Sequence, residues 1–505
     1  MPRNLGVLWA AHRADDRVVI IDLLDPDRPR EVRYPEFEAA CNAVAHAFTA
    51  AGLGVGDRFG LLSDNRLEYL EIFYGAMRAG IVPVPINGRV PKETVEWVVA
   101  DSGCRLVFVD DAHRELCPDG ARVIGIDGAG ERSYAAFRQP HEDKGSFPVW
   151  DPPDDAVCFQ PYTSGSTGRP KGVLLLHRAH VWVSKTISEV RDITTADRMV
   201  VAAPFYHKNA MNAVKSMLWA GGSMVILPRF GARGFLNVIG RYGITILSGV
   251  PTIYALMLQE QDLVKRTDLS SVRLITMGGA PASDPLIDAV AEAFPGAEIV
   301  QIYGITETGA ALFGPHPERE PRPRHSLGWP IPGNAFRFID GPSADEGMLL
   351  VKSPGMMLGY HNNPGETAKR LQDGWYHTGD VLRRDADGWF YFLDRADDMF
   401  VSAGNNIFPG EVEDMLERHP DIHQAAVVAV PDPVKHRLPV AFIVLREGAR
   451  LSEDAVKKYA LANAPAYQHP RRVIFVDALP LTGAGKIDRK SLTARAGELA
   501  AGGTA

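Results

Sequence analysis

Apolar residues follow helical and strand periods in alternation along the first 300 residues of the chain. In residues 34–51 they recur three and four positions apart, as at Phe37, Ala40 and Val44, which predicts a helix that Gly52 ends. Short apolar runs between such segments predict buried strands at residues 59–62, 82–86, 106–109, 199–203, 223–227, 244–248, 274–277 and 298–302. Alternation at this pace predicts the α/β class, with mainly parallel sheets that helices cover on both faces.

The pattern changes after about residue 328, where short β-forming runs alternate with Gly and Asp turns, as in residues 347–352 and 388–393. A final section from about residue 394 has helical and strand patterns of its own. We therefore predict two domains. Residues 1–394 form a large N-terminal domain of packed, mainly parallel α/β sheets with a β-rich subdomain, and residues 395–505 form a small α+β C-terminal domain.

Composition and charge narrow the class of protein. Of the 505 residues, 46% are hydrophobic and 23% are charged, which is typical of a folded globular chain. Lys and Arg total 54 against 62 Asp and Glu, and this net charge of −8 disfavours a nucleic-acid partner, which would favour a basic surface. An anionic small ligand stays compatible, because a local site can oppose the overall sign.

Cysteine usage and hydropathy bear on location. The four cysteines are widely spaced, which predicts neither a disulfide framework nor a zinc site and suits a reducing compartment. The apolar run at residues 5–11 is too short for a convincing signal peptide. The longest apolar stretch, residues 244–258, contains Pro251 and is too short to span a bilayer. These features predict a cytoplasmic protein without a membrane span.

The strongest chemical signal is the glycine- and hydroxyl-rich segment at residues 162–172, which follows a predicted strand at 156–159. Its backbone N–H groups, hydroxyl groups and one ammonium group can surround a polyphosphate. A flexible Gly/Ser turn is the plain alternative, but the run is long and particular. The spacing is not that of a Walker A loop. The residues expected to bind phosphate are Thr163, Ser164, Gly165, Ser166, Thr167, Gly168 and Lys171.

Four further segments carry polar groups suited to a nucleotide. Residues 303–307 offer a hydroxyl and a carboxylate after a strand, and residues 376–380 end on a carboxylate that could accept hydrogen bonds from a ribose diol. Residues 394–398 are highly charged, and residues 481–486 end a Gly-rich turn with a lysine. Taken singly, these segments are explained better as a turn, a capping residue, a charged linker and a hairpin tip.

In this order, the five segments resemble the core motifs of the acyl-adenylate-forming (ANL) superfamily, in its branch of acyl- and aryl-CoA synthetases (AMP-dependent synthetases and ligases). The resemblance extends over nearly the whole chain and includes residues 278–281 and 402–413. It implies an enzyme that joins a carboxylic acid to ATP with loss of pyrophosphate and then transfers the acyl group to a thiol. ATP, Mg²⁺ and coenzyme A are the implied cofactors.

The resemblance also implies a role for individual residues. Thr163 to Lys171 would hold the β- and γ-phosphates, Glu307 would hold Mg²⁺, and Lys486 would be the catalytic cation of adenylation. The C-terminal domain would be mobile and turn about Asp397 between the two half-reactions, so that the segment around Gly404 replaces Lys486. The residues implied to contact the adenosine and the α-phosphate are Gly279, Ala280, Pro281, Tyr303, Gly304, Thr306, Asp380 and Arg395.

The acyl pocket is implied by the segment that ends at His207, which relatives use to border the acid and which we count with Lys486, Thr163 and Glu307 as catalytic. Residues 208–212 contain no acid, which disfavours an amino-acid substrate because its ammonium group would be unpaired. The other expected lining residues are Ala210, Met211, Val250, Gly278, Gly304, Ala310 and Leu312. This mostly small or apolar lining favours a bulky apolar, aromatic or fatty acid, although several of these residues could equally belong to the core.

Free coenzyme A is the expected acceptor, with a separate acyl carrier protein as the alternative. His436 and Arg437 stand where many relatives have Gly-Glu, and Gln468 stands where many have lysine. These departures leave open a changed acceptor, a relative proficient in only one half-reaction, or neutral drift. A non-catalytic nucleotide-binding relative and a luciferase are the rival functions, and a homodimer is kept open.

Overall fold

The structure is a computed structural model of the whole chain, and it describes residues 1–163, 169–396, 399–402, 405–432, 436–464, 468–482 and 486–500. In the described residues, no helix combines the length and the apolar character needed to cross a bilayer.

A seven-stranded sheet forms the centre of the N-terminal domain, in the order β14-β13-β12-β10-β11-β1-β2, and its neighbours are parallel except at the edge pair β1–β2. The bounds are β1 Val18–Asp22, β2 Arg30–Arg33, β10 Arg198–Val201, β11 Ser223–Ile226, β12 Ile246–Gly249, β13 Leu274–Gly278 and β14 Glu298–Ile302. Alternate residues face opposite cores, as Met199 and Val201 belong to one cluster while Val200 and Ala202 belong to another. Both faces are therefore buried, as the continuous apolar runs predicted.

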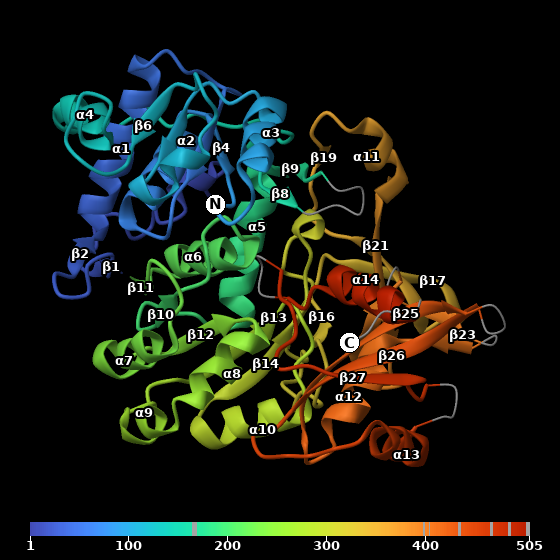
Figure 1. The fold of residues 1–505 in the computed structure, drawn as a ribbon. Helices are drawn as coiled ribbons and strands as arrows, with labels where there is room; N and C mark the ends of the chain where they lie inside the picture. Colours follow the sequence, from blue (N-terminus) through green and yellow to red (C-terminus); the bar gives the residue numbers. More distant parts are fainter. Residues whose placement is uncertain are drawn as a thin grey trace.

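Helices cover each face of this sheet (Figure 1). On one side lie α7 Ala232–Tyr242, α8 Pro251–Gln259, α9 Gln261–Arg266 and α10 Asp284–Ala293. On the other lie α1 Tyr34–Ala50, α2 Leu67–Arg78, α5 His177–Val190 and α6 Lys208–Ala220, preceded by the short helix η1 Leu5–Val7.

A smaller parallel sheet of order β4-β3-β5-β6 packs on the far side of α1 and α2. Its strands are β3 Arg58–Leu62, β4 Val82–Pro85, β5 Val107–Val109 and β6 Val123–Gly125, and its other face is covered by α3 Lys92–Ser102 and η2 Asp111–Leu116. The short helices α4 Tyr134–Arg138 and η3 Gln139–Lys144 follow. Strand β4 holds two prolines and is an edge strand, because proline has no N–H for a second neighbour.

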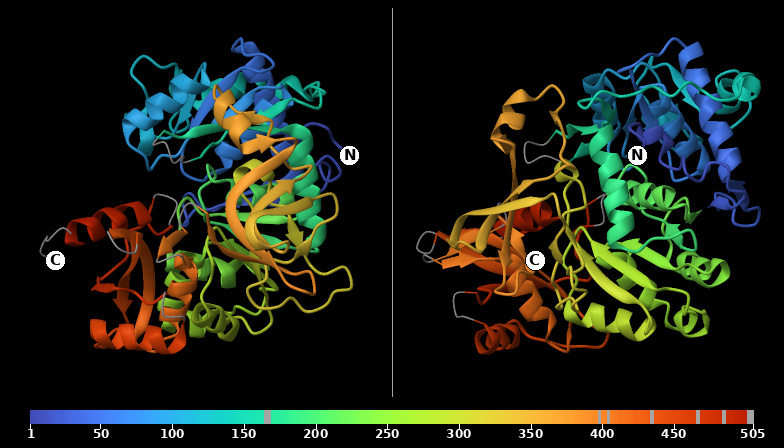
Figure 2. Two further views of the ribbon diagram at one scale, coloured as in Figure 1. Left: turned by 90° about the vertical axis from the view of Figure 1, so that its right-hand side faces the viewer. Right: turned by 180° about the vertical axis from the view of Figure 1, so that it is seen from behind.

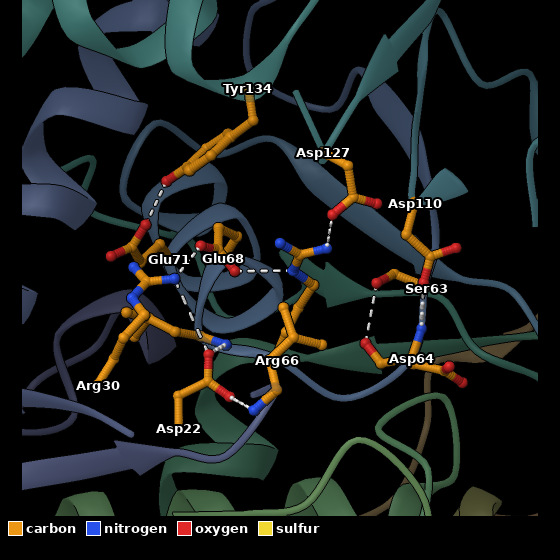
Figure 3. Close-up of polar contacts among 12 residues, drawn as sticks. Asp22, Arg30, Ser63, Asp64, Arg66, Glu68, Glu71, Asp110, Asp127 and Tyr134 are labelled. Carbon is orange, nitrogen blue, oxygen red and sulfur yellow. Dashed lines mark hydrogen bonds and ion pairs between the residues drawn. The ribbon is translucent and has the colours of Figure 1, made fainter. Parts of the chain in front are cut away.

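A network of charged side chains ties these layers together at the start of α2 (Figure 3). Arg30 and Arg66 both bind the carboxylate of Glu68, and Arg66 also binds Asp127 at 2.6 Å. Asp22 accepts the backbone N–H of Leu67 at 3.2 Å. The network joins β1 and β2 of the large sheet to the turn after β6 of the small one, so it fixes the two sheets relative to each other.

The β-rich part consists of two antiparallel sheets. One contains β7 Val157–Phe159, β8 Tyr162–Thr163, β9 Lys171–Leu176 and β19 Gly359–Tyr360, and the other contains β17 Ala335–Ser343, β18 Glu346–Lys352, β20 Leu371–Gln372, β21 Trp375–Arg384 and β22 Phe390–Arg395. A two-stranded pair of β15 Phe313–Gly314 and β16 Trp329–Pro330 packs nearby, and the connections include η4 Thr306–Thr308 and α11 Pro364–Arg370. In Figure 1, β19 and α11 lie beside β8 and β9.

The C-terminal domain has its own hydrophobic cores on the two faces of the sheet β25-β26-β27. Its elements are β23 Phe400–Ser402, β24 Asn405–Ile407, α12 Pro409–Glu417, β25 Ile422–Asp432, β26 His436–Leu445, α13 Glu453–Asn463, β27 Arg472–Phe475 and α14 Arg489–Ala500. Val427 faces α12 and α13, whereas Val428 faces α14. Figure 2 shows this domain as a separate body beside the large one. The predicted α/β class with a β-rich part and a small C-terminal domain is confirmed, and the boundary at residue 394 stays a prediction.

Candidate active site

The expected phosphate-binding segment connects two antiparallel strands. Thr163 in β8 pairs with Lys171 in β9, and residues 164–168 between them, which include the predicted Ser164, Gly165, Ser166, Thr167 and Gly168, lie outside the described residues. The Lys171 ammonium donates to Glu366 Oε1 of α11 at 2.7 Å and lies 5.5 Å from the centre of the Tyr360 ring. Lys171, the first residue of β9, is therefore held against α11 by its ion pair with Glu366.

Glu307 and Lys171 both lie beside the side chain of Tyr360. The Tyr360 hydroxyl donates to Glu307 Oε1 at 2.9 Å and lies 2.9 Å from the Tyr376 hydroxyl. Burial and the neighbouring Glu307 carboxylate raise the pKa of Tyr360, so it stays a neutral donor. The predicted metal ligand and the predicted phosphate lysine are thus brought to opposite sides of one aromatic side chain.

The residues expected to bind adenosine follow the carboxyl ends of two neighbouring parallel strands, β13 and β14, where Gly278 pairs with Ile302. Gly279, Ala280 and Pro281 are exposed there. The Tyr303 hydroxyl donates to Asp380 Oδ2 at 2.6 Å. Three segments that are far apart in the chain therefore meet at this edge of the large sheet.

Asp380 and Arg395 face each other across the antiparallel strands β21 and β22. Arg395 Nε lies 3.7 Å from Asp380 Oδ1, and the Asp380 side chain is buried while that of Arg395 is about half exposed. Burial raises the pKa of Asp380, and the charge of Arg395 and the hydrogen bond from Tyr303 oppose that shift. A carboxylate held by these two partners is oriented toward the same edge as Gly279.

Lys486 brings the C-terminal domain to this edge. Its Cε lies 3.7 Å from the position that a β-carbon on Gly279 would take. Although much of Lys486 is exposed, the surrounding protein lowers the pKa of its ammonium group; Arg395 lowers it further and Asp380 opposes the change. Lys486 thus lies among the residues expected to bind the α-phosphate and the ribose, and its neighbours at 483–485 are outside the described residues.

Comparison with known proteins decides the family. The family model of the AMP-binding enzyme matches residues 7–361, and that of the AMP-binding enzyme C-terminal domain matches residues 411–486. The chain belongs to the AMP-binding enzyme family. Together with the CoA-ligase relatives, these matches confirm the predicted superfamily, its acyl- and aryl-CoA synthetase branch and the enzyme class, an AMP-forming acid–thiol ligase.

Individual relatives cover nearly the whole chain. A feruloyl-CoA synthase of an Amycolatopsis species is 33% identical over 473 residues, which is 92% of this chain and 94% of that protein. The fatty acid–acyl-carrier-protein ligase ScoC of Streptomyces coeruleorubidus is 33% identical over 480 residues, 92% of each chain. The crystal structure of ATP-bound MatB from Rhodopseudomonas palustris has a TM-score of 0.89 and 28% sequence identity, and the alignment covers 99% of this chain and 100% of that one.

In this AMP-binding enzyme, His207 immediately precedes helix α6. Its Nε2 is buried without a hydrogen-bond partner in the described structure. Burial, with help from the charges of Arg89 and Lys486, lowers the pKa of His207 to about 4, so the ring is neutral at pH 7. A neutral imidazole with one free nitrogen can accept or donate one hydrogen bond to a bound acid.

The predicted lining residues of the acyl pocket fall into groups. Val250 lies beside Gly279, where a β-carbon would be 3.4 Å from Val250 Cγ1, and Gly304 packs against Ala310 so closely that a β-carbon would lie 2.8 Å from Ala310 Cα. Gly278 ends β13 in this region. The remaining three, Ala210, Met211 and Leu312, are almost fully buried within hydrophobic clusters. Their role as lining stays a prediction.

Four side chains were missed from the sequence; Tyr360 and Glu366 contact predicted site residues directly, while Tyr376 contacts Tyr360 and Lys208 contacts the backbone next to the site. Tyr360, Tyr376 and Glu366 reach the site from β19, β21 and α11, and Lys208 at the start of α6 donates to the backbone carbonyl of Ile305. Burial lowers the pKa of Lys208 to about 7, with Glu307 opposing. Only Lys208 had a signal, because a cation directly after His207 is unexpected in an apolar pocket.

Three residues of the C-terminal domain depart from the family pattern, and the structure shows the neighbours of Gln468, His436 and Arg437. The Gln468 amide donates to Glu411 Oε2 of α12 at 2.8 Å and is almost fully buried. In the hairpin of β25 and β26, Arg437 pairs with Pro431, and His436 pairs with Asp432. Of these three residues, Gln468 is held by a hydrogen bond to Glu411 within the C-terminal domain.

Proposed function

We propose that the protein is an ATP- and Mg²⁺-dependent acyl-CoA synthetase that activates a bulky apolar, aromatic or fatty carboxylic acid as acyl-AMP and transfers the acyl group to coenzyme A. The observation that carries the proposal is the position of Lys486 beside Gly279, Asp380 and Arg395. A cation at the junction of the acid, the α-phosphate and the ribose is the group that adenylation needs. The feruloyl-CoA synthase relative supports an aryl or acyl substrate.

In the first half-reaction, a carboxylate oxygen attacks the α-phosphorus of ATP, and pyrophosphate leaves with the electrons of the broken P–O bond. Lys486 lies between the attacking carboxylate and the α-phosphate and neutralises the repulsion between these two negatively charged groups. Thr163, Thr306 and Lys171 hold the phosphates, while Asp380 and Arg395 fix the ribose and Tyr303, Ala280 and Pro281 contact the adenine. Catalysis is then mainly positioning and electrostatic stabilisation.

The carboxylate of Glu307 fits a Mg²⁺ ion. Its Oε1 is oriented by the Tyr360 hydroxyl, and its side chain is only partly buried in the middle of η4. Mg²⁺ prefers one or two carboxylates together with phosphate oxygens, and it would supply positive charge that offsets the charge of the triphosphate. Tyr360 would hold the carboxylate in place for this role.

In the second half-reaction, the thiol sulfur attacks the acyl carbon, and AMP leaves with the electrons of the carbon–oxygen bond. We assign the pivot of the C-terminal domain to Asp397 and the replacement of Lys486 to the segment around Gly404, both of which lie outside the described residues. His207, as a neutral residue, borders the acyl group. The two separate cores of the C-terminal domain support its movement as one body.

A carrier protein is the second candidate acceptor, since ScoC is named as a ligase for an acyl carrier protein. We further propose a cytoplasmic location, which the four separated cysteines support.

The test is to incubate the protein with ATP, Mg²⁺ and a pool of aryl, fatty and polycyclic acids, with and without coenzyme A, and to identify products by mass spectrometry. We expect acyl-CoA only when coenzyme A is present. Acyl-AMP that accumulates even with coenzyme A would instead favour the carrier-protein acceptor. If no product forms with any acid, and synthetic acyl-AMP is not converted to acyl-CoA either, the proposed acyl-CoA synthetase function is wrong.

A further inference from the structure

Helix α6 begins with a cation in an electrostatically unfavourable place. Lys208 is its first residue, and the first turn contains no acidic side chain. The amino end of a helix carries partial positive charge, so a lysine there costs stability unless an anion is nearby. In the described residues, its ammonium group donates a hydrogen bond to the Ile305 carbonyl and forms no ion pair, although the charge of Glu307 is close enough to raise its pKa against the effect of burial.

Asn212 lies one turn further along the same face of α6. Asn212 is 4% exposed, and both its Nδ2 and its Oδ1 are buried without a hydrogen-bond partner in the described structure. Residues four apart share a helix face, so Lys208 and Asn212 lie one turn apart on the same face of α6. Unpaired buried amides are uncommon and costly, which indicates that a ligand group completes this one.

This face of α6 meets the segment that we propose to line the acyl pocket. Lys215, one further turn along, bonds to His180 of α5 at 2.7 Å, so the face is directed at α5. The same helix α5 touches residues 309–310, because a β-carbon on Gly309 would lie 2.9 Å from Val183 Cγ2 and Ala310 packs with Val183. Lys208 and Asn212 therefore lie where α5, α6 and the 304–310 segment converge.

We infer, on the basis of the function proposed above, that Lys208 and Asn212 bind a second anionic group of the acid, so that the preferred substrate is an aromatic or aliphatic carboxylic acid that also bears a carboxylate or a similar oxyanion. The ammonium group supplies charge, and the amide of Asn212 donates a second hydrogen bond. The apolar residues of the pocket contact the body of the acid. An acid without this group leaves two buried polar side chains unpaired, which disfavours its binding.

The test uses cinnamic acids that carry a carboxylate at the ortho, meta or para ring position, each paired with the acid that carries a methyl group at the same ring position. The readout is kcat/KM for acid-dependent pyrophosphate release with ATP, Mg²⁺ and coenzyme A. The wild-type protein should prefer at least one diacid over its methyl partner. Lys208→Met should lower kcat/KM for that diacid by about ten- to a hundredfold, as expected for a lost hydrogen bond to a charged group.

Further variants separate recognition from folding. Lys208→Arg should keep the preference for the diacid, and Asn212→Leu should reduce it, whereas Lys265→Met, at an exposed position of α9, should leave it unchanged. If Lys208→Met does not fold, the comparison is made in the wild-type protein by measuring how the other acids inhibit activation of one methylcinnamate. A diacid should then inhibit more strongly than its methyl-substituted partner. Activation of the methyl acids with no diacid preference and no effect of Lys208→Met overturns the inference and leaves the proposed function standing. The absence of pyrophosphate release with every acid would overturn the proposed function itself.

Discussion

At the scale of single residues, Lys486 has the largest expected effect. It comes from the C-terminal domain, yet its electrostatic neighbours Arg395 and Asp380 precede that domain's sheet. Its position therefore depends on the way in which the two domains are arranged, and a group on a mobile domain can serve one half-reaction and leave before the other.

Lys486→Ala should lower the rate of acyl-AMP formation by about a hundredfold or more, which is the usual cost of removing a preorganised charge from a reaction centre. Transfer of the acyl group from preformed acyl-AMP to coenzyme A should be spared. Pyrophosphate release and thioester formation are measured separately. Lys490→Ala, on the exposed surface of α14, is the matched control, and equal loss of both steps in Lys486→Ala would refute its assigned role.

His113 provides a prediction about pH. Its Nδ1 lies 2.6 Å from Asp110 Oδ1, and this hydrogen bond raises the pKa of His113. Asp110 appears with Ser63 and Asp64 in Figure 3. A histidine whose pKa is raised by folding stabilises the protein below its ordinary value of about 6.5, and this contribution is lost as the pH rises through the raised pKa.

The melting temperature of His113→Gln should therefore fall below that of the wild type by more at pH 6 than at pH 9. Asp110→Asn should remove the same pH-dependent difference, because it removes the partner of the imidazolium. A constant difference between wild type and His113→Gln across this range would show that the pair does not contribute through its charge.

At the scale of elements, the site depends on close contact between short connections and the ends of strands. After β14, the chain turns back at Gly304 so tightly that a β-carbon would meet both Ala310 Cα at 2.8 Å and the Gly309 carbonyl at 2.9 Å. A glycine is required here because these two neighbours are backbone atoms that cannot rotate away.

Gly304→Ala should displace the 304–310 segment and with it Glu307. Overpacking of this kind costs about 1–3 kcal/mol, so kcat/KM for the acid should fall by about tenfold or more. Gly296→Ala is the control, because a β-carbon on Gly296 meets nothing within 4 Å. Unchanged steady-state kinetics in Gly304→Ala would mean that this turn does not position the site.

At the scale of the whole molecule, charged side chains connect the C-terminal domain to the large one in the part of the chain that the structure describes. Arg418 of α12 lies 3.9 Å from Asp284 of α10, and Lys486 reaches into the site. The domain retains its own cores on both sides of its sheet, so its rotation would not expose them. Such an arrangement suits a rigid body that changes position between the half-reactions.

Asp397→Pro should restrict that rotation, because proline fixes one backbone dihedral angle. We expect acyl-AMP formation to persist while transfer to coenzyme A is lost, which is the reverse of the pattern in Lys486→Ala. The measurement is pyrophosphate release in parallel with acyl-CoA formation. Retained thioester formation in Asp397→Pro would count against the pivot.

Much of the fold was predictable from local patterns. The helix expected at residues 34–51 is α1, Tyr34–Ala50, and the strand expected at 298–302 is β14, Glu298–Ile302. The two prolines of β4, which have no N–H for a second neighbour, are consistent with its place at the edge of the small sheet. Periodicity and turn residues act over a few positions, so they can be read directly from the chain.

The class of chemistry could also be predicted from the chain, because motifs such as residues 162–172 and 303–307 are contiguous. The side chains that support these motifs become visible only in the folded protein. Lys171 and Glu366 are 195 positions apart, and Tyr360 reaches Glu307 across 53. Nor does any local pattern tell that Asn212 is buried beside Met211 with no hydrogen-bond partner among the described residues. Contacts of this kind arise from the packing of whole elements, which brings distant residues together and leaves no periodic signal in the chain.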